Sequence, residues 1–176
     1  MPVPIFEITE QRVECAQLPP EMSPLLAYWD GKRSGGRMPR RRDIDPLEFK
    51  DFLGRVNLVE IKAPPERFIF RVLGTRFPLR PGGARDGQGI SIIPPAIYRN
   101  MLARQFEEGC ALGAPTLYAN TFVFDGMSYS YMRLMLPLGD DRETVDRLLL
   151  LSHGRYAEQD HFWAHWAQRQ RRRAVI

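Results

Sequence analysis

The sequence lacks the features that define several large classes of protein. Its two cysteines, Cys15 and Cys110, form no CxxC pair, so a reducing compartment and no disulfide framework are expected. No apolar run approaches the roughly 20 residues of a membrane span. The first residues also lack the basic and apolar regions of a signal peptide. Together these absences predict a cytoplasmic protein with no membrane span.

Signatures of catalysis are missing as well. The sequence contains no GxSxG, no DxD in a metal-binding loop and no cysteine beside a histidine. His161 and His165 have the i, i+4 spacing of helical metal ligands, but the only other histidine is His153 and no HExxH sequence is present. We therefore expect a protein that is not an enzyme, and we predict no metal site.

The net charge of +4 is unevenly distributed along the 176 residues. Basic side chains concentrate in residues 32–42 and again in residues 169–173. Such clusters can contact phosphates on nucleic acid or lipid head groups, although a solvated loop and a frayed terminus explain the same runs. The candidate anion or nucleic-acid contacts are Arg37, Arg40, Arg41 and Arg42.

The most informative pattern lies in residues 114–139, where two alternating segments flank the dipeptide Asp125-Gly126. Asp-Gly supplies the positive φ angles of a type I′ hairpin turn, and this turn places Tyr118 opposite Arg133. One face of the hairpin then carries bulky side chains with polar tips, and the other carries small and aliphatic ones. This asymmetry predicts binding rather than chemistry. The bulky face consists of Tyr118, Asn120, Phe122, Phe124, Met127, Tyr129, Tyr131, Arg133 and Met135.

Proline, glycine and apolar periodicity define the other elements. Ser23 is a possible N-cap for the first helix. The unalternated leucines at 148–151 predict a central strand covered on both faces. The expected elements are a possible short strand at 5–8, helices at 24–32 and 46–53, strands at 56–62 and 67–74, an irregular segment at 75–89, a helix at 96–108, a strand at 144–152 and a helix at 158–173.

This order predicts an α+β fold. Its centre is a five-stranded antiparallel sheet with helices on one face, accompanied by N-terminal helices and a C-terminal helix. The expected organisation is an N-terminal arm over residues 1–22, one domain over 23–155, and a C-terminal helix with a basic tail over 156–176.

Three segments resemble a bacterial PAS-type family. Members open with a Trp-containing helix and a loop of glycine, arginine and proline, here AYWDGKRSGGRMPRRRDIDP at 27–46. A strand ending in FRxxGT follows, here FIFRVLGT at 68–75, and later an aromatic strand with an arginine before LPL, here YSYMRLMLPLGDD at 129–141. The resemblance covers residues 25–153. It implies a PAS fold and a sensory or interaction role in signalling.

The sequence also departs from that family. After Thr75 it is unusually rich in proline, glycine and arginine (RFPLRPGGARDGQG). The GxNCRFLQ sequence of flavin-binding light sensors is missing, and the helical crossover has no histidine, where haem-binding relatives place their axial ligand. These departures argue against a flavin adduct and a haem, and no other cofactor is evident.

The candidate ligand-binding residues combine the bulky hairpin face with one arginine of the FRxxGT strand and one methionine of the crossover helix. An arginine among aromatic rings can bind a carboxylate or phosphate bidentately, or it can stack on Tyr118 and pair with an acid from a packed helix. The smaller hairpin face is an alternative wall for a cavity. The candidates are Arg71, Met101, Tyr118, Asn120, Phe122, Tyr129, Tyr131 and Arg133.

The sequence thus predicts a stand-alone PAS-like sensory or interaction domain without an attached effector. It would bind a small molecule or a signalling protein, pass on a change through its flanking helices and form a homodimer. The alternative is a protein that binds nucleic acid or an anionic surface through the arginines of 33–42 and 169–173.

Overall fold

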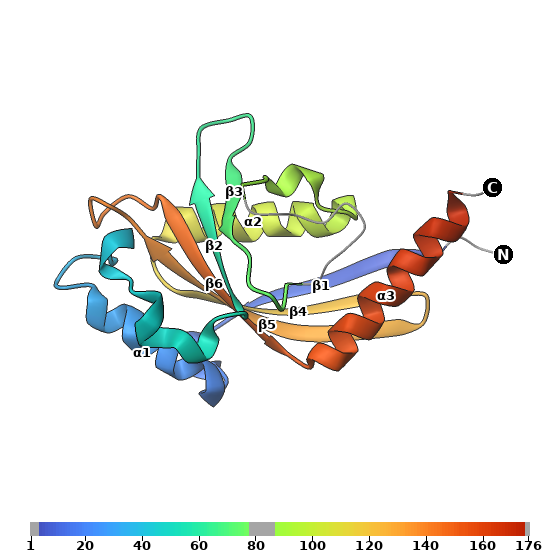
Figure 1. The fold of residues 1–176 in the computed structure, drawn as a ribbon, viewed down its shortest axis with the longest axis horizontal. Coiled ribbons are helices and arrows are strands. Elements are labelled where there is room, and N and C mark those ends of the chain that lie inside the picture. Colours follow the sequence, from blue (N-terminus) through green and yellow to red (C-terminus); the bar gives the residue numbers. More distant parts are fainter. Residues whose placement is uncertain (1–3, 78–86, 175–176) are drawn as a thin grey trace.

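The computed structural model describes residues 4–77 and 87–174. Six strands form one antiparallel sheet in the order β1-β4-β5-β6-β2-β3 (Figure 1). The elements are β1 (Phe6–Val13), α1 (Ser23–Lys32), β2 (Val56–Ile61), β3 (Phe68–Val72), α2 (Ala96–Leu112), β4 (Thr116–Phe124), β5 (Met127–Leu138), β6 (Arg147–Gly154) and α3 (Tyr156–Arg173). Short 3₁₀ turns lie at Cys15–Gln17, Pro20–Met22, Arg41–Asp43, Pro46–Phe52 and Ile90–Ile92.

The β4–β5 hairpin has the predicted register. Tyr118 lies opposite Arg133 and Phe122 lies opposite Tyr129. Asp125 and Gly126 have φ angles of 51° and 78°, the positive values that a type I′ turn requires. The turn therefore fixes which side chains share a face.

The prediction that residues 1–22 form an N-terminal arm outside the domain is wrong for residues 6–13, which belong to the sheet. Residues 6–13 form the full edge strand β1, which pairs with β4 from Phe6 opposite Phe124 to Val13 opposite Leu117. Its alternating pattern was hidden by charged residues, because the outward face of an edge strand is solvated. The predicted five-stranded sheet therefore has six strands.

The prediction of a central strand at 148–151 is confirmed. Strand β6 lies between β5 and β2. Leu148 and Leu150 enter the core on one face of the sheet, whereas Leu149 and Leu151 enter the core on the other. The unalternated leucine run reflects this burial on both faces.

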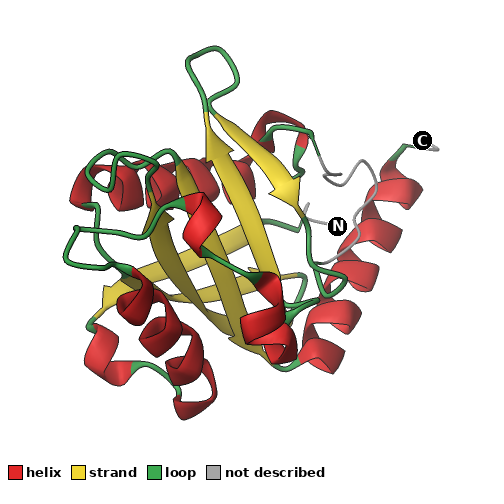
Figure 2. Ribbon diagram, turned by 60° about the vertical axis from the view of Figure 1, so that its left-hand side comes forward, coloured by secondary structure: helices red, strands yellow, loops and turns green. Residues whose placement is uncertain are grey.

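Helical segments cover both faces of the sheet, which corrects the prediction of helices on one face only (Figures 1 and 2). On one face α2 and α3 cover what we call the aromatic core, which contains Phe68, Phe70, Tyr98, Phe106, Phe122, Tyr129, Tyr131, Phe162, Trp163 and Trp166. On the other face α1 and the neighbouring 3₁₀ turns cover the aliphatic core, which contains Met22, Leu25, Trp29, Met38, Ile44, Leu134, Leu136, Leu138, Leu149 and Leu151.

Several helix boundaries differ from expectation. Ser23 is the first residue of α1, and the N-cap position is occupied by Met22, whose side chain makes no capping bond. The helix expected at 46–53 is a 3₁₀ segment with non-helical backbone at Phe49, capped by Asp45. Helix α2 extends to residue 112. The irregular segment expected at 75–89 falls largely on residues 78–86, outside the described residues.

Helix α3 packs across the aromatic core near the start of β1 (Figure 1). The Phe6 ring stacks on Trp163 with ring centres 5.7 Å apart. Near its end, α3 is joined to the hairpin turn, because Asp125 contacts the His165 ring nitrogen at 2.9 Å and accepts a bond from Arg169 at 3.0 Å. In the described part of the chain, no helix has the length and apolar character needed to cross a bilayer.

Candidate functional site

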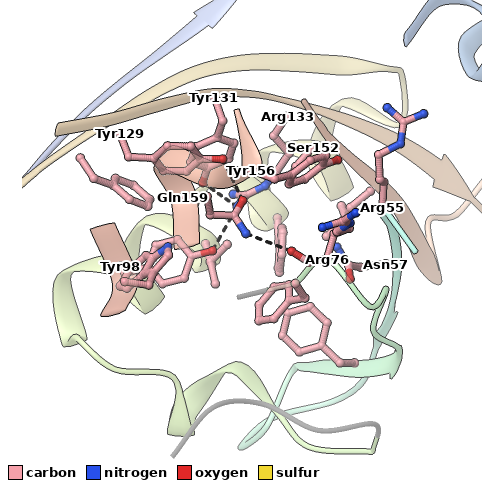
Figure 3. Close-up of a pocket in the computed structure, with 17 residues that line it drawn as sticks. Arg55, Asn57, Arg76, Tyr98, Tyr129, Tyr131, Arg133, Ser152, Tyr156 and Gln159 are labelled. Carbon is pink, nitrogen blue, oxygen red and sulfur yellow. Dashed lines mark hydrogen bonds between the residues drawn. The ribbon is translucent and has the colours of Figure 1, made fainter. Parts of the chain in front are cut away.

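A small pocket lies within the aromatic core, where β5 and β6 face α2 and α3 (Figure 3). We call it the Arg133 pocket. Its cavity volume is about 30 Å³, which is enough for one or two water molecules. The apolar lining is Phe70, Phe77, Leu102, Phe106, Phe122, Leu150 and Trp163. The polar lining is Arg55, Asn57, Arg76, Tyr98, Tyr129, Tyr131, Arg133, Ser152, Tyr156 and Gln159.

Arg133 occupies the sheet side of this pocket and is only 3% exposed. Strand alternation in β5 points it toward α2, where one guanidinium nitrogen donates to the Gln105 side-chain oxygen at 2.9 Å. The other terminal nitrogen donates to the hydroxyls of Tyr131 at 2.7 Å and Tyr98 at 3.3 Å. The guanidinium carbon lies 5.2 Å from the centre of the Tyr131 ring.

All of these partners of Arg133 are neutral. No carboxylate among the described residues forms a hydrogen bond or an ion pair with its guanidinium. Burial alone would lower the pKa of Arg133, but the oxygens of Tyr131 and Tyr98 outweigh it and the pKa is raised. The side chain therefore stays charged, and a buried charge without a counter-charge is costly by several kcal/mol.

Gln105 on α2 connects Arg133 to the edge strand β1. Its side-chain nitrogen donates to Asn120 at 2.8 Å and to the Glu10 carboxylate at 2.9 Å. Glu10 also accepts two bonds from Arg104, at 2.7 and 2.9 Å. The acid reached from Arg133 through this amide is thus already paired with another arginine.

Gln159 makes an equivalent connection from α3. The Tyr129 hydroxyl donates to its side-chain oxygen at 2.8 Å, and its nitrogen donates to the Arg76 carbonyl at 3.0 Å (Figure 3). Burial raises the pKa of Tyr129, so its hydroxyl stays a neutral donor. One buried amide therefore joins β5, α3 and the segment after β3.

Two further arginines line the pocket on the side away from Tyr98 (Figure 3). The Arg76 guanidinium lies 5.1 Å from the centre of the Tyr156 ring, and that of Arg55 lies 5.0 Å from the centre of the Phe52 ring. Among the described residues neither arginine forms an ion pair.

The Tyr156 hydroxyl is buried and has no hydrogen-bond partner within the described part of the chain. Burial raises its pKa, and the neighbouring Arg55 guanidinium counteracts that effect. No Asp or Glu is among the described residues that line the pocket. The Arg133 pocket is thus positively charged and retains an unused hydroxyl.

The structure brings together half of the predicted ligand-binding residues. Phe122, Tyr129, Tyr131 and Arg133 line the pocket. Three more are buried on the same side of the sheet without lining it. Tyr118 donates to Glu108, Asn120 bonds Gln105, and Met101 packs in the aromatic core.

The prediction for Arg71 is wrong. Strands β2 and β6 separate its strand β3 from β5. Phe70 lines the pocket, so alternation directs Arg71 to the opposite face, where it is exposed and pairs with Glu60. Sequence alternation alone contained this signal, but the strand order was needed to use it.

The predicted anion cluster is largely engaged within the protein. Arg40 bonds both oxygens of Asp43 at 2.9 Å, Arg41 donates to the Ile44 carbonyl, and Arg37 donates to the Leu112 carbonyl. Arg37 and Arg42 are exposed. Three of the four predicted arginines therefore also fasten their loop to the domain, and anion binding by the cluster stays a prediction.

Cys15 and Cys110 form no disulfide. Across residues 4–77 and 87–174, no three His, Cys, Asp or Glu side chains converge as metal ligands would.

Residues 18–90 match a family model described as PAS domain. The resemblance predicted over residues 25–153 is confirmed for its first two segments, at 27–46 and 68–75, and the third segment, at 129–141, lies outside the match. The α+β architecture is consistent with a PAS fold, and the match suggests a sensory or interaction role. No curated protein and no solved structure matches the chain at a significant level.

Proposed function

We propose that this protein is a PAS-type sensory domain that binds a small molecule in the Arg133 pocket. The match over residues 18–90 supports the sensory role. The observation that carries the proposal is the pocket itself, where aromatic rings, those of four tyrosines included, and aliphatic side chains surround convergent guanidinium, hydroxyl and amide groups. That composition is typical of small-molecule sites.

The polar groups of the pocket favour binding over catalysis. They are arginine, tyrosine, asparagine, glutamine and serine side chains, and no carboxylate, histidine or cysteine is among the described residues that line it. General acid–base catalysis near neutral pH relies on groups that titrate there, chiefly histidine or a perturbed carboxylate. We therefore propose that the domain has no catalytic activity of its own.

The buried Gln159 indicates how ligand binding would be transmitted to the C-terminal helix. The pocket has room for only one or two water molecules, so a larger ligand must displace side chains that line it. Gln159 bridges Tyr129 and the Arg76 carbonyl, and a ligand group that replaces either bond shifts α3. Binding and movement of the C-terminal helix are thereby coupled.

A thermal-shift screen of a metabolite library tests the proposal. A ligand present at 100 times its Kd stabilises the folded state by about 2.7 kcal/mol, which raises Tm by several degrees. Native mass spectrometry of the same sample detects copurified ligand and tests the predicted homodimer. The proposal fails if no compound shifts Tm and no ligand is retained.

Two matched variants locate the binding site. Ser152 lines the pocket opposite Arg133 on β6, so the two added methyl groups of Ser152→Val reduce the small space there. Ser128 is exposed on the other face of the same sheet, so Ser128→Val adds the same groups outside. We expect compounds from the screen to stabilise Ser128→Val as they do the wild type, and to lose their effect on Ser152→Val. Equal stabilisation of both variants would place the site elsewhere.

A further inference from the structure

The charge of the Arg133 pocket indicates which class of molecule it accepts. Three arginines line it and no acidic residue does so among the described residues. We propose that its ligand is a small ring compound bearing an oxyanion group, a carboxylate or a phosphate, with the oxyanion bound by Arg133. This inference rests on the proposed function, because it specifies the chemistry of the same site.

The unpaired charge of Arg133 is the first argument. The guanidinium is 3% exposed, and its protein partners are an amide oxygen and two tyrosine hydroxyls. A neutral ligand would leave this buried charge uncompensated. An anion supplies the missing counter-charge and forms charge-assisted hydrogen bonds, which are about twice as strong as neutral ones.

The second argument comes from the opposite side of the pocket. Arg55 and Arg76 stack on the rings of Phe52 and Tyr156, and Arg55 also donates one bond to the Asp51 carbonyl at 3.3 Å, so N–H donors of both guanidinium groups remain for a ligand. The unpartnered Tyr156 hydroxyl adds another donor at the same side. These groups create a positive potential that attracts anions into the pocket and opposes the entry of cations.

The aromatic walls are the third argument, and they indicate a ring. Phe122 meets Tyr98, Tyr131 and Trp163 edge to face, with ring centres 5.2 to 5.7 Å apart. An added ring can continue this pattern, and aromatic pairs contribute beyond the area that they bury. A benzene-sized guest needs a cavity of about 150 Å³, so entry must move pocket side chains away from their present positions.

Isothermal titration with four ring compounds tests the inference. Sodium benzoate and phenyl phosphate carry the two oxyanions, benzamide is the neutral counterpart of benzoate, and benzylamine is a cation. We expect at least one anion to bind the wild-type protein. Benzamide should bind about tenfold more weakly or not at all, since it lacks the charge-assisted bond to the guanidinium. Benzylamine should not bind.

Three variants assign the effect to one side chain. Arg133→Met should weaken anion binding about tenfold or more, and Arg133→Lys should restore part of it by keeping the charge. Arg71→Met is the matched control, because Arg71 is an exposed arginine of the same sheet outside the pocket. It should bind anions as the wild type does. Circular dichroism establishes that each variant is folded before titration.

The outcomes separate this inference from the proposed function. Binding of benzamide as tight as that of benzoate, or unchanged anion binding by Arg133→Met, would overturn the ligand class and leave a small-molecule pocket. The same conclusion follows if all four probes fail while a neutral metabolite binds in the screen. If neither the probes nor any metabolite binds, both proposals fail.

Discussion

The two faces of the central sheet bury different kinds of side chain. The aliphatic core beneath α1 consists mainly of leucine, methionine and isoleucine, and the Trp29 indole makes a buried bond to the Pro137 carbonyl at 2.8 Å. The aromatic core beneath α2 and α3 instead consists mainly of aromatic rings. Arg133 lies among them and is hydrogen-bonded to Gln105, and Gln159 is hydrogen-bonded to Tyr129. Both cores share β6, whose leucines alternate between them.

We expect the two cores to contribute differently to the stability of the fold. Apolar contacts in the aliphatic core stabilise the fold with little desolvation cost. The aromatic core contains a buried cation that a well-packed apolar residue could replace without loss of stability. A group that does not stabilise the folded chain is better explained by what it binds.

The largest expected effect is on the aliphatic core. Leu134 is fully buried there, so Leu134→Ala should lower the free energy of unfolding by about 3 kcal/mol through lost burial and a residual cavity. Urea denaturation measures this change. The control is Leu47→Ala, since Leu47 is 76% exposed and its truncation should change stability by less than about 0.5 kcal/mol. Equal effects would contradict the assigned core.

A smaller effect is expected where the aromatic core is joined to α3. Tyr129→Phe removes the donor to the buried Gln159 oxygen, which should cost about 1 to 2 kcal/mol. Adding Gln159→Leu removes the orphaned oxygen, and the double variant should recover part of the loss. A double-mutant cycle with no coupling energy would show that the bond does not form in solution.

Arg133→Met is expected to change stability by less than about 1 kcal/mol, although it removes three buried hydrogen bonds. Those bonds go to neutral oxygens, and their loss is offset by removal of an uncompensated charge. Chemical denaturation of the unliganded protein checks this. A loss above about 3 kcal/mol would mean that the guanidinium is already compensated without a ligand.

The smallest effect concerns acid. The hydrogen bond from Arg40 lowers the pKa of Asp43 to about 2, and Arg142 contributes to the shift. A carboxylate with a depressed folded pKa contributes stability that is complete above its unfolded pKa, near 4, and is lost as pH falls toward 2. Urea unfolding measures the free energy of unfolding at pH 5 and at pH 2.5. The decrease between the two pH values should be smaller for Asp43→Asn than for the wild-type protein. An equal drop would contradict the ion pair.

Sequence reasoning was most successful where local chemistry determines structure. The Asp125-Gly126 turn defined the register of β4 and β5, and with it the face that carries Phe122, Tyr129, Tyr131 and Arg133. The leucines of β6 likewise revealed a strand buried on both sides. Turn geometry and side-chain period act over a few residues, so a single sequence contains them.

The rest depended on how distant segments meet. Strand β1 was underestimated because its outward residues are charged, and its partner β4 is more than 100 residues away. Gln105 and Gln159 gave no signal, since glutamine is ordinary on an exposed helix face. Arg55 and Arg76 lie near the ends of β2 and β3, and only tertiary packing turns them toward Arg133.

The contact between α3 and the hairpin turn has a mechanical consequence. Asp125 bonds both His165 and Arg169, so the tip of the longest hairpin and the distal turns of α3 are clamped together. Gln159, which precedes both residues near the start of α3, lines the Arg133 pocket. If binding moves Gln159, the Asp125 contacts tie that movement of α3 to the hairpin turn and to the edge strand β1 paired beside it.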